Sequence, residues 1–222
     1  MAAGRSTRLG AGPPKQYQPV GGVPMVLRAL RPFVAHPEVA QVVLVLPPAD
    51  AAAPPEFLRG LAAAGLLVVP GGPERRDSVA AGLAALASAC TTVLVHDAAR
   101  PFVDRPVIDA VIARARAGEG AVAAVRVSDT LKEASVEDPS LVSRTLPRDG
   151  LWRAQTPQGF PRAVLERAHA AASGVAGAAT DDAALVERLG VPVRLVPDSP
   201  RNLKVTTAED LALAELLAGR GE

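Results

Sequence analysis

Short apolar runs alternate with helix-like segments along almost the whole chain of 222 residues. The apolar runs are rich in β-branched residues and lack strict polar alternation, which is the pattern of strands buried on both faces. The segments between them repeat apolar residues every three or four positions, as amphipathic helices do. We therefore predict a single-domain, Rossmann-like α/β fold with a mostly parallel, twisted sheet flanked by helices. The predicted strands are 41–47, 66–69, 91–97, 121–127 and 191–197, and the predicted helices lie within 24–36, 74–89, 105–118, 181–190 and 206–219.

The stretch from Ser128 to Phe160 breaks this alternation. It lacks a long helical pattern and contains short extended pieces separated by Pro139, Pro147 and Gly150. A segment of this length without a helix is unusual inside a compact α/β domain and often serves a function. We predict one domain spanning 1–222, with a β-arm at about 128–160 that projects from the sheet and makes dimer contacts.

The charge balance argues against a nucleic-acid partner, because 24 basic residues stand against 23 acidic ones and nucleic-acid binders carry a basic surface. No apolar run reaches the length of about 18 residues that a membrane-spanning helix needs, and nothing resembles a secretory signal. Cys90 is the single cysteine, so no internal disulfide can form. We expect a cytoplasmic protein that binds neither nucleic acid nor a membrane.

The opening residues form a glycine- and proline-rich loop that carries cations. The loop matches neither the P-loop nor the dinucleotide fingerprint, because its lysine lies between Pro14 and Gln16 and a third spaced glycine is missing. The small residues Ala2, Ala3 and Gly4 let backbone N–H groups approach a ligand, and two cations follow at Arg8 and Lys15. Backbone donors and cations together suit a polyphosphate. An N-terminal coil with surface arginines is the alternative interpretation.

This loop is the first of seven ordered blocks, AAGRSTRLGAGPPKQY, GGPERRDSVAAGL, VLVHDAARPF, VSDTLKE, RDGLWRAQTPQGF, ATDDAALVE and RNLKVTTAEDL, which cover nearly the whole chain. In this order and spacing they resemble the sugar-type nucleotidyltransferases, in particular the 2-C-methyl-D-erythritol 4-phosphate cytidylyltransferase family. The resemblance implies transfer of CMP from CTP to the phosphate of methylerythritol phosphate, with release of pyrophosphate, in the non-mevalonate route to isoprenoid precursors. It also implies Mg²⁺ or another divalent cation as cofactor, and a homodimer in which the arm crosses to the other subunit.

The resemblance also assigns roles to residues of this chain. The implied catalytic residues are Arg8 and Lys15, which grip the triphosphate, and Arg148 and Lys204, which hold the acceptor phosphate. The implied nucleotide-binding residues are Ala2, Ala3, Gly4, Gly72, Ser78 and Asp97, and Asp97 is also the implied metal ligand. The implied acceptor-binding residues are Arg100, Asp129, Thr130, Thr156 and Thr180.

Three of these residues also have plain structural interpretations. Asp97 follows a predicted strand, where open α/β sheets place ligand groups, but its carboxylate could instead cap the turn that comes next. Ser78 could be an ordinary hydroxyl in the first turn of a helix. Thr180 could be no more than a helix N-cap.

Two features depart from the family pattern. Members normally begin several residues earlier with an apolar strand in the middle of the sheet, whereas Met1 stands where the proline that ends this strand would be. We expect the absence of that strand to expose its neighbours and to leave backbone groups unpaired. Pro73 stands near the base where the family often has an acidic residue, and proline offers no backbone N–H.

Other functions stay open at this point. Ribitol 5-phosphate cytidylyltransferases share most of these blocks and differ in the acceptor pocket. A nucleotide-sugar glycosyltransferase is less favoured, because its metal usually sits on a D-x-D pair and no two aspartates here are two residues apart. A non-enzymatic nucleotide-binding protein would need the charge of the opening loop but not the identity of Lys15.

Overall fold

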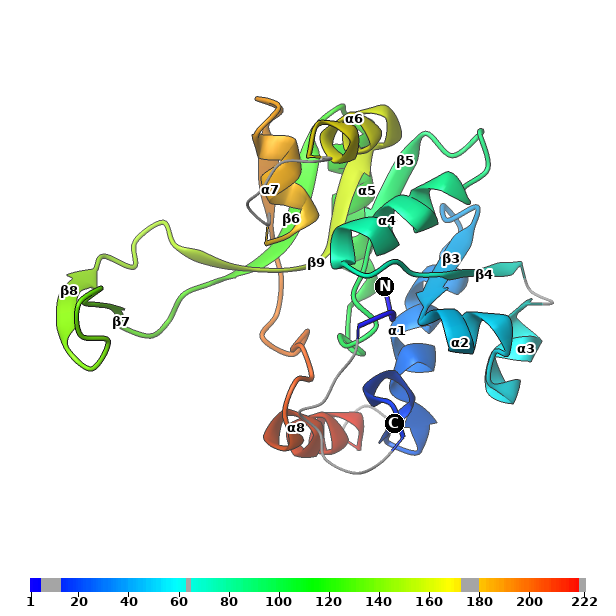
Figure 1. Cartoon of the computed structure of the whole chain (residues 1–222), viewed down its shortest axis with the longest axis horizontal. Helices are drawn as coiled ribbons and strands as arrows, with labels where there is room; N and C mark the ends of the chain where they lie inside the picture. Colours follow the sequence, from blue (N-terminus) through cyan, green and yellow to red (C-terminus); the bar gives the residue numbers. More distant parts are fainter. Residues whose placement is uncertain (5–12, 63–64, 173–179, 220–222) are drawn as a thin grey trace.

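The computed structural model describes residues 1–4, 13–62, 65–172 and 180–219 (Figure 1). Its larger sheet has the strand order β10–β6–β9–β5, formed by Val193–Pro197, Gly120–Arg126, Trp152–Pro161 and Thr92–Val95. β10 pairs parallel with β6, and β9 pairs antiparallel with both β6 and β5. β5, β6 and β10 therefore point the same way, and their carboxyl ends lie at the same edge of the sheet.

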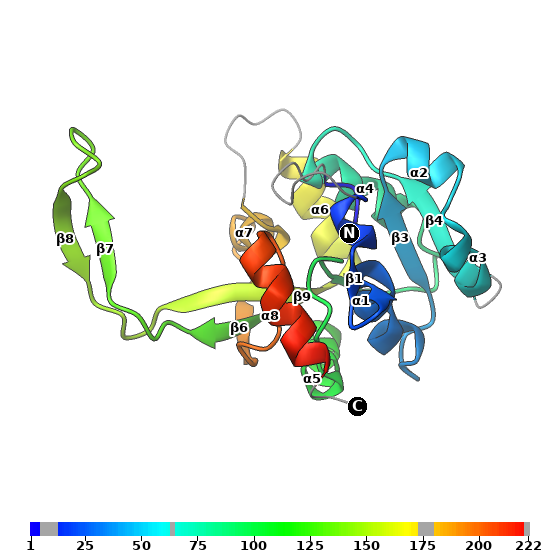
Figure 2. The same cartoon turned by 90° about the horizontal axis from the view of Figure 1, so that it is seen from below.

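Helices cover both faces of this sheet (Figure 2). One face carries α5, and the other carries α4, α6 and α7; their bounds are Arg105–Arg116, Arg75–Ala84, Arg162–Ala172 and Asp182–Glu187. Ala121 and Ala123 of β6 pack with Val111 of α5, whereas Val122 packs in a separate cluster with Leu165 of α6. Burial on both faces explains why the strand sequences lack polar alternation. The prediction of an α/β domain with a helix-flanked sheet is confirmed.

The remaining elements extend this core on two sides. A separate parallel pair, β3 and β4, lies beside α2 and α3, with bounds Val42–Leu46, Leu66–Pro70, Pro48–Ala52 and Glu56–Ala62. The base of the molecule holds a short 3₁₀ turn, η1, the small hairpin β1–β2, and helices α1 and α8, with bounds Lys15–Tyr17, Pro19–Val20, Val23–Pro24, Met25–Val34 and Ala208–Ala218. All five predicted helices and all five predicted strands are present. Helices α2, α3 and α6 were not predicted.

Helix α8 begins as the sequence predicts. The Thr207 hydroxyl accepts a hydrogen bond from the Asp210 N–H, and the Asp210 carboxylate accepts one from the Thr207 N–H at 3.0 Å. These two bonds satisfy two of the orphan donors at a helix start. No helix in the described ranges combines the length and the apolar character that crossing a membrane requires.

The predicted arm is too long at its carboxyl end. Residues 152–160 belong to β9, which lies between β5 and β6 and is buried from Gln155 to Phe160. The sequence does not reveal this strand because Gln155 and Gln158 are polar. They are nevertheless 6% and 1% exposed, and they bond to the buried Asn202 carbonyl and Ala183 N–H. The antiparallel direction of β9 also means that one central strand opposes the otherwise parallel sheet.

The part that projects is the hairpin β7–β8, formed by Leu131–Ala134 and Val142–Leu146. Figure 1 shows it standing well away from the body at the end of two extended connections. Val136 at its tip is 99% exposed, and Leu141 and Val142 are about 60% exposed. Apolar side chains on a protruding hairpin are typical of an interaction surface.

A gap separates β3 from β5. Among the described strands β3 pairs only with β4, and β5 pairs only with β9. Residues 1–2 bridge the carboxyl end of this gap, because the Ala2 N–H donates to the Val45 carbonyl and the Ala98 N–H donates to the Met1 carbonyl, each at 2.9 Å. The Met1 amine donates to the His96 carbonyl at 2.6 Å, and burial lowers the pKa of this amine to about 6.

The rest of the gap is a cavity of about 300 Å³, with Leu44 and Val43 on one wall and Val93 and Leu94 on the other. The unpaired edges of β3 and β5 agree with the expectation from the sequence. A cavity between two strands lowers stability, because its lining loses dispersion contacts.

Filling this cavity should stabilise the protein. We expect an added N-terminal segment of five β-branched residues to pair with both edges and raise the free energy of unfolding by about 2 kcal/mol or more, which is about 4–8 °C in Tm for a chain of this size. The amide that replaces the Met1 amine can still donate to the His96 carbonyl and carries no buried charge. Calorimetry should show no such rise for a matched Gly-Ser extension; an equal rise for both would exclude strand insertion.

Candidate active site

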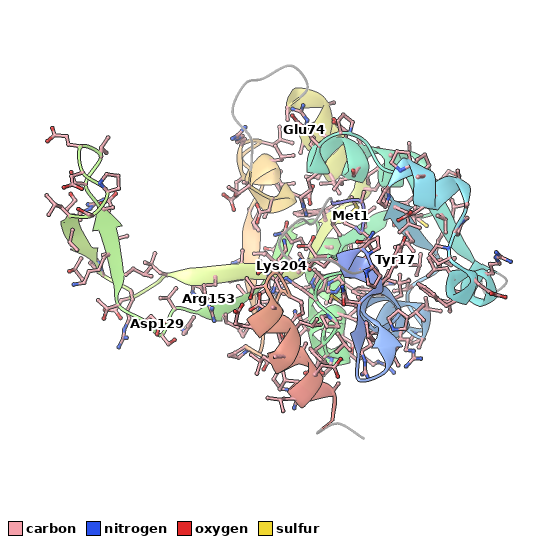
Figure 3. All side chains as sticks on the ribbon, turned by 60° about the horizontal axis from the view of Figure 1, so that its bottom comes forward. Met1, Tyr17, Glu74, Asp129, Arg153 and Lys204 are labelled. Carbon is pink, nitrogen blue, oxygen red and sulfur yellow. The ribbon has the colours of Figure 1, made fainter. Side chains whose placement is uncertain are left out.

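The carboxyl edge of the parallel strands gathers most of the predicted site residues. Asp97 follows β5, the loop with Gly71 and Gly72 follows β4, and Lys204 follows β10 (Figure 3 labels Lys204 and Met1). Residues 1–3 run between β3 and the end of β5, so the opening loop begins at this edge. Open α/β sheets bind ligands at the carboxyl ends of their strands.

Asp97 is the charged centre of this edge. Its carboxylate is 13% exposed and pairs with Lys204 Nζ at 2.7 Å, while Arg75 Nη2 lies 4.0 Å from its other oxygen. Burial alone would raise the pKa of Asp97, but the charges of Lys204 and Arg75 outweigh burial and hold that pKa far below its usual value. Asp97 is therefore a fixed negative charge held between two cations, and the turn-capping interpretation does not describe it.

The loop after β4 is built for close approach. The Gly72 N–H donates to the Ser78 hydroxyl oxygen at 3.1 Å, and this hydroxyl lies 3.1 Å from the Glu74 carbonyl, so Ser78 ties the loop to the first turn of α4. A Cβ on Gly72 would lie 2.4 Å from Asp77 Cβ, and one on Gly71 would lie 2.5 Å from Ala3 Cβ. Only glycine fits at these two positions, which leaves the loop backbone beside residues 2–3.

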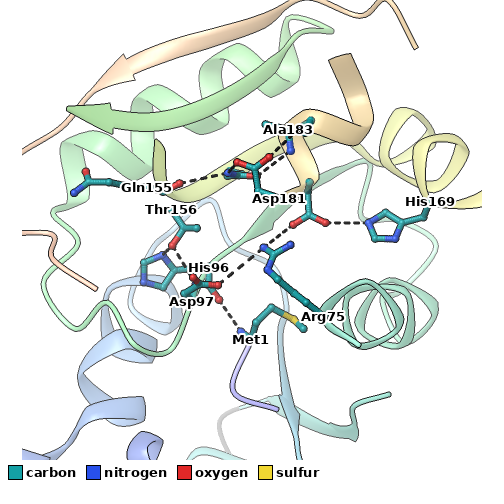
Figure 4. A network of polar contacts seen from close by, with 12 residues as sticks. Met1, Arg75, His96, Asp97, Gln155, Thr156, His169, Asp181 and Ala183 are labelled. Atoms are coloured by element: carbon teal, nitrogen blue, oxygen red, sulfur yellow. Dashed lines mark hydrogen bonds and ion pairs between the residues drawn. The ribbon is translucent and has the colours of Figure 1, made fainter. Parts of the chain in front are cut away.

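A hydrogen-bond chain fixes the end of β5 against β9 (Figure 4). The Asp97 N–H donates to Thr156 Oγ1 at 3.1 Å, and this hydroxyl lies 2.9 Å from His96 Nδ1. His96 Nε2 lies 3.0 Å from the Arg100 carbonyl, so Nε2 carries the proton and Nδ1 accepts from Thr156. Burial lowers the pKa of His96 to about 4, which keeps the ring neutral in this chain.

The loop that carries Lys204 is anchored through Asn202. The Asn202 carbonyl accepts from Arg100 Nη1 at 2.7 Å and from Gln155 Nε2 at 2.9 Å, and Asn202 Nδ2 donates to the Thr156 carbonyl at 2.8 Å. Arg100, Gln155 and Asn202 are all less than 9% exposed. These bonds connect the Lys204 loop to β9 and to the turn after Asp97, and they place Lys204 at its pairing distance.

The structure sorts the predicted residues into two groups. The residues of the body at or near the carboxyl edge are Ala2, Ala3, Gly4, Gly72, Ser78, Asp97, Arg100, Thr156 and Lys204. Lys15 is the first residue of η1. The residues in the connections to the hairpin are Asp129, Thr130 and Arg148; all three are exposed, and Arg148 donates to the Ser128 carbonyl. Figure 3 shows Asp129 far from Lys204 within one chain.

Arg8 and Thr180 are the two remaining predicted residues. Arg8 lies outside the described residues. Thr180 is exposed and is not the N-cap of α7, because Asp181 holds that position and its carboxylate accepts from the Ala184 N–H at 2.9 Å.

Sequence reasoning missed three charged or titratable residues of the site. Arg75 lies between Asp97 and Asp182, and Asp182 is bonded to His169. Two signals were available: Arg75 starts a helix directly after the glycine loop, and Asp182 stands in a pair of adjacent aspartates. Neither signal shows that a strand, α4, α6 and α7 converge at one point.

A divalent cation would find one suitable ligand here. No group of three His, Cys, Asp or Glu side chains that could hold a metal exists within the described part of the chain. Mg²⁺ commonly uses one or two carboxylates, with substrate phosphates and water completing its shell. Asp97 alone therefore fits a cation that arrives with a phosphate ligand, and it does not form a metal site of its own.

Comparison with known proteins gives a consistent result. The family model described as 2-C-methyl-D-erythritol 4-phosphate cytidylyltransferase matches residues 1–220. A protein of Salinibacter ruber with that name is 44% identical over 97% of this chain and 90% of its own length. A crystal structure of 2-C-methyl-D-erythritol 4-phosphate cytidylyltransferase from Thermus thermophilus is 40% identical, covers 94% of this chain and 95% of its own, and has a TM-score of 0.79.

Some relatives are longer. The bifunctional enzyme IspD/IspF of Rhodospirillum rubrum is 45% identical over the whole of this chain, which spans 57% of that protein. The chain covers 56% of the length of a second bifunctional relative, from Desulforudis audaxviator. The chain thus covers just over half of these two relatives.

Thr156 should contribute to stability through its two buried bonds. Thr156→Val keeps the shape but leaves the Asp97 N–H and His96 Nδ1 unpaired, so we expect the free energy of unfolding to fall by about 1–3 kcal/mol. Thr156→Ser keeps the hydroxyl and should lose less than half as much. Urea unfolding monitored by circular dichroism measures both variants, and equal losses would show that the methyl group, not the hydroxyl, matters.

Proposed function

The chain belongs to the 2-C-methyl-D-erythritol 4-phosphate cytidylyltransferase family, and from this premise we propose that it transfers CMP from CTP to 2-C-methyl-D-erythritol 4-phosphate and releases pyrophosphate. The observation that carries the proposal is the pairing of Asp97 with Lys204 and Arg75 beside a glycine loop, at the carboxyl edge of the strands. Such a site presents fixed cations and close backbone to a phosphorylated ligand. A cytoplasmic location stays a prediction from the sequence.

Charge is the main physical obstacle to this reaction. The acceptor phosphate carries nearly two negative charges above its second pKa of about 6, and it must approach a more highly charged triphosphate. Two unit charges 4 Å apart repel by about 4 kcal/mol at an effective dielectric constant of 20. Lys204 and Arg75 supply compensating charge at Asp97, and Lys15 begins the 3₁₀ turn that follows the opening loop. Positioned cations and in-line alignment therefore provide most of the catalysis.

The acceptor phosphate is already ionised, so the attack needs no general base. The histidines agree with this, because each is engaged elsewhere: His36 with Asp109 at 2.8 Å, His96 with Thr156, and His169 with Asp182. We assign the nucleotide to the side of the edge formed by residues 2–3 and the loop of Gly72 and Ser78. Pro73 has no N–H, and the N–H groups of Gly71, Gly72 and Glu74 already donate to Leu46, Ser78 and Asp77.

We further propose that a divalent cation accompanies CTP and that Asp97 holds it. Such an ion would neutralise phosphate charge when bound. The support is chemical: a largely buried carboxylate with a strongly depressed pKa stays ionised at any physiological pH. Lys204 pairs with Asp97 Oδ2 at 2.7 Å, whereas the contact of Oδ1 with Arg75 is longer, at 4.0 Å.

We also propose a homodimer in which each site is completed by the partner's arm. Arg148 lies in the connection after β8 and donates to the Ser128 carbonyl, next to Asp129, which Figure 3 shows far from Lys204. Within one chain Arg148 and Lys204 therefore do not meet, although both are assigned to the acceptor phosphate. The exposed Val136, Leu141 and Val142 give the hairpin an apolar surface that a second copy would cover.

Pyrophosphate release is the direct test of the proposed reaction. We expect CTP-dependent release of pyrophosphate with 2-C-methyl-D-erythritol 4-phosphate. The kcat/KM for ribitol 5-phosphate should be at least about 10²-fold lower, because an acceptor pocket that fits one polyol leaves polar groups unpaired with another. A coupled phosphate assay measures both acceptors. Activity with ribitol 5-phosphate alone would replace the proposed acceptor, and sugar transfer without pyrophosphate would indicate a glycosyltransferase.

Complementation between subunits tests the shared site. We expect Lys15→Ala and Arg148→Ala each to lower kcat/KM by about 10²-fold, because each removes a phosphate-binding cation. Arg148→Ala should act mainly through the KM for the acceptor. Mixed under conditions that exchange subunits, the two variants should recover part of the activity, since one site of each heterodimer keeps both residues.

The control for this experiment is Lys132→Ala. Lys132 is also an arm cation, but its amine donates to the Thr145 hydroxyl within the hairpin. We expect it to keep the wild-type rate. Proven subunit exchange without any recovery of activity would contradict the shared site.

A further inference from the structure

A line of charged side chains leads from Asp97 into the body of the protein (Figure 4). Arg75 Nη2 lies 4.0 Å from Asp97 Oδ1 and 2.7 Å from Asp182 Oδ2. The other oxygen of Asp182, Oδ1, is hydrogen-bonded to His169 Nε2 at 3.0 Å. The Asp182 side chain is 1% exposed and the His169 side chain is 6% exposed. These two residues therefore cannot touch a substrate, and the proposed reaction does not account for them.

The position of Asp182 is fixed from both sides. Gln158 of β9 donates to the Asp181 carboxylate at 2.8 Å and accepts from the Ala183 N–H at 3.0 Å, which fastens the first turn of α7 to the sheet. His169 of α6 donates to Asp182, because an ionised carboxylate only accepts. Burial works to raise the pKa of Asp182, but the His169 hydrogen bond and the Arg75 charge outweigh it and lower that pKa.

Arg75 is shared unequally between two carboxylates. The same nitrogen, Nη2, makes a short contact with Asp182 and a long one with Asp97. The second oxygen of Asp97 is already paired with Lys204. Without Asp182, the strongest partner left for the guanidinium would be Asp97 Oδ1, and a closed Arg75–Asp97 pair would occupy that oxygen.

We propose that Asp182, held by His169, is a positioning residue that keeps Arg75 beside Asp97 without letting it close on that carboxylate. Arg75 then remains a fixed positive charge at the edge of the site, with its side chain 36% exposed, and Asp97 Oδ1 stays available to a ligand. This inference rests on the proposed transfer of CMP, because the benefit of an open Asp97 lies in that reaction. It assigns the adjacent aspartates of α7 separate tasks: Asp181 caps the helix, and Asp182 restrains Arg75.

Asp182→Asn is the first test. The amide keeps the shape and a bond to His169 but loses the charge that attracts Arg75, so we expect Arg75 to swing onto Asp97. A crystal structure of the ligand-free variant should then show an Arg75 nitrogen within hydrogen-bond distance of Asp97 Oδ1, where the wild type shows a wider separation. The kcat should fall about 10-fold or more, as small displacements of positioning groups do, while the KM for CTP changes less than about threefold.

A double-mutant cycle separates positioning from general damage. Arg75→Gln removes the side chain that Asp182 restrains. If Asp182 acts through Arg75, the double variant should be no slower than Arg75→Gln alone, so the two effects on kcat are not additive. Additive losses would overturn the proposal.

His169 variants test the outer bond and cover the case in which Asp182→Asn does not fold. His169→Gln keeps a donor that can reach Asp182 and should retain at least half of kcat, whereas His169→Leu should lose about fivefold or more. The matched control is His36→Leu, because His36 is a buried histidine just after α1 that pairs with Asp109 of α5 at 2.8 Å, away from the carboxyl edge. His36→Leu should lower Tm and leave kcat unchanged.

The readouts distinguish failure of this inference from failure of the proposed function. Wild-type protein that releases no pyrophosphate from CTP with either acceptor would contradict the proposed function, and the Arg75 position in the Asp182→Asn crystal would still decide the inference. An active wild type, with Asp182→Asn and His169→Leu both within twofold of its kcat, would overturn the inference alone. Arg75 unmoved in the variant crystal would do the same.

Discussion

The ionised carboxylate of Asp97, held largely out of water, sets conditions that the surrounding structure has to meet. An unpaired buried charge is strongly unfavourable, so this carboxylate persists only with cations in fixed places. Lys204 comes from the loop after β10 and Arg75 from the first residue of α4. The position of Lys204 depends in turn on Asn202, which is bonded to Thr156 of β9. The position of Arg75 depends on Asp182, the first residue of α7. One charge thus links elements from four distant parts of the chain.

β9 is the element through which these links pass. It is antiparallel to its neighbours, and its buried polar residues face several partners: Gln155 bonds to the Asn202 carbonyl, Thr156 to His96 and the Asp97 N–H, and Gln158 to the start of α7. A strand of ordinary apolar residues would pack the sheet equally well but would not place the Lys204 loop or α7. The buried polar groups therefore give β9 its positioning role, and the hydrogen bonds that they make lower the cost of burying them.

The sequence predicted the elements whose pattern is local. The runs at 42–46 and 92–95 are apolar on both faces, so their pattern predicts buried strands. The capping residues Thr207 and Asp210 predict the start of α8. Neither prediction needs tertiary information. β9 was missed because its burial is supported by hydrogen bonds from distant residues, which no local pattern shows. Asp97 and Lys204 could be assigned from the family resemblance, whereas Asp182 could not, since its function depends on a contact with Arg75 across more than a hundred residues.

The position of Arg148 on the arm can be explained by the repulsion between cations in the proposed site. A site that must bring two anionic phosphates together needs cations on more than one side, yet every cation added to a single rigid edge repels its neighbours while the site is empty. Arg148 on a projecting connection avoids this, because it is exposed to water until a second surface meets it. In the proposed dimer, the exposed apolar residues of the hairpin would provide association energy that charge alone would not. The separation of Arg148 from Lys204 within one chain is thus the physical reason for which we propose a shared site.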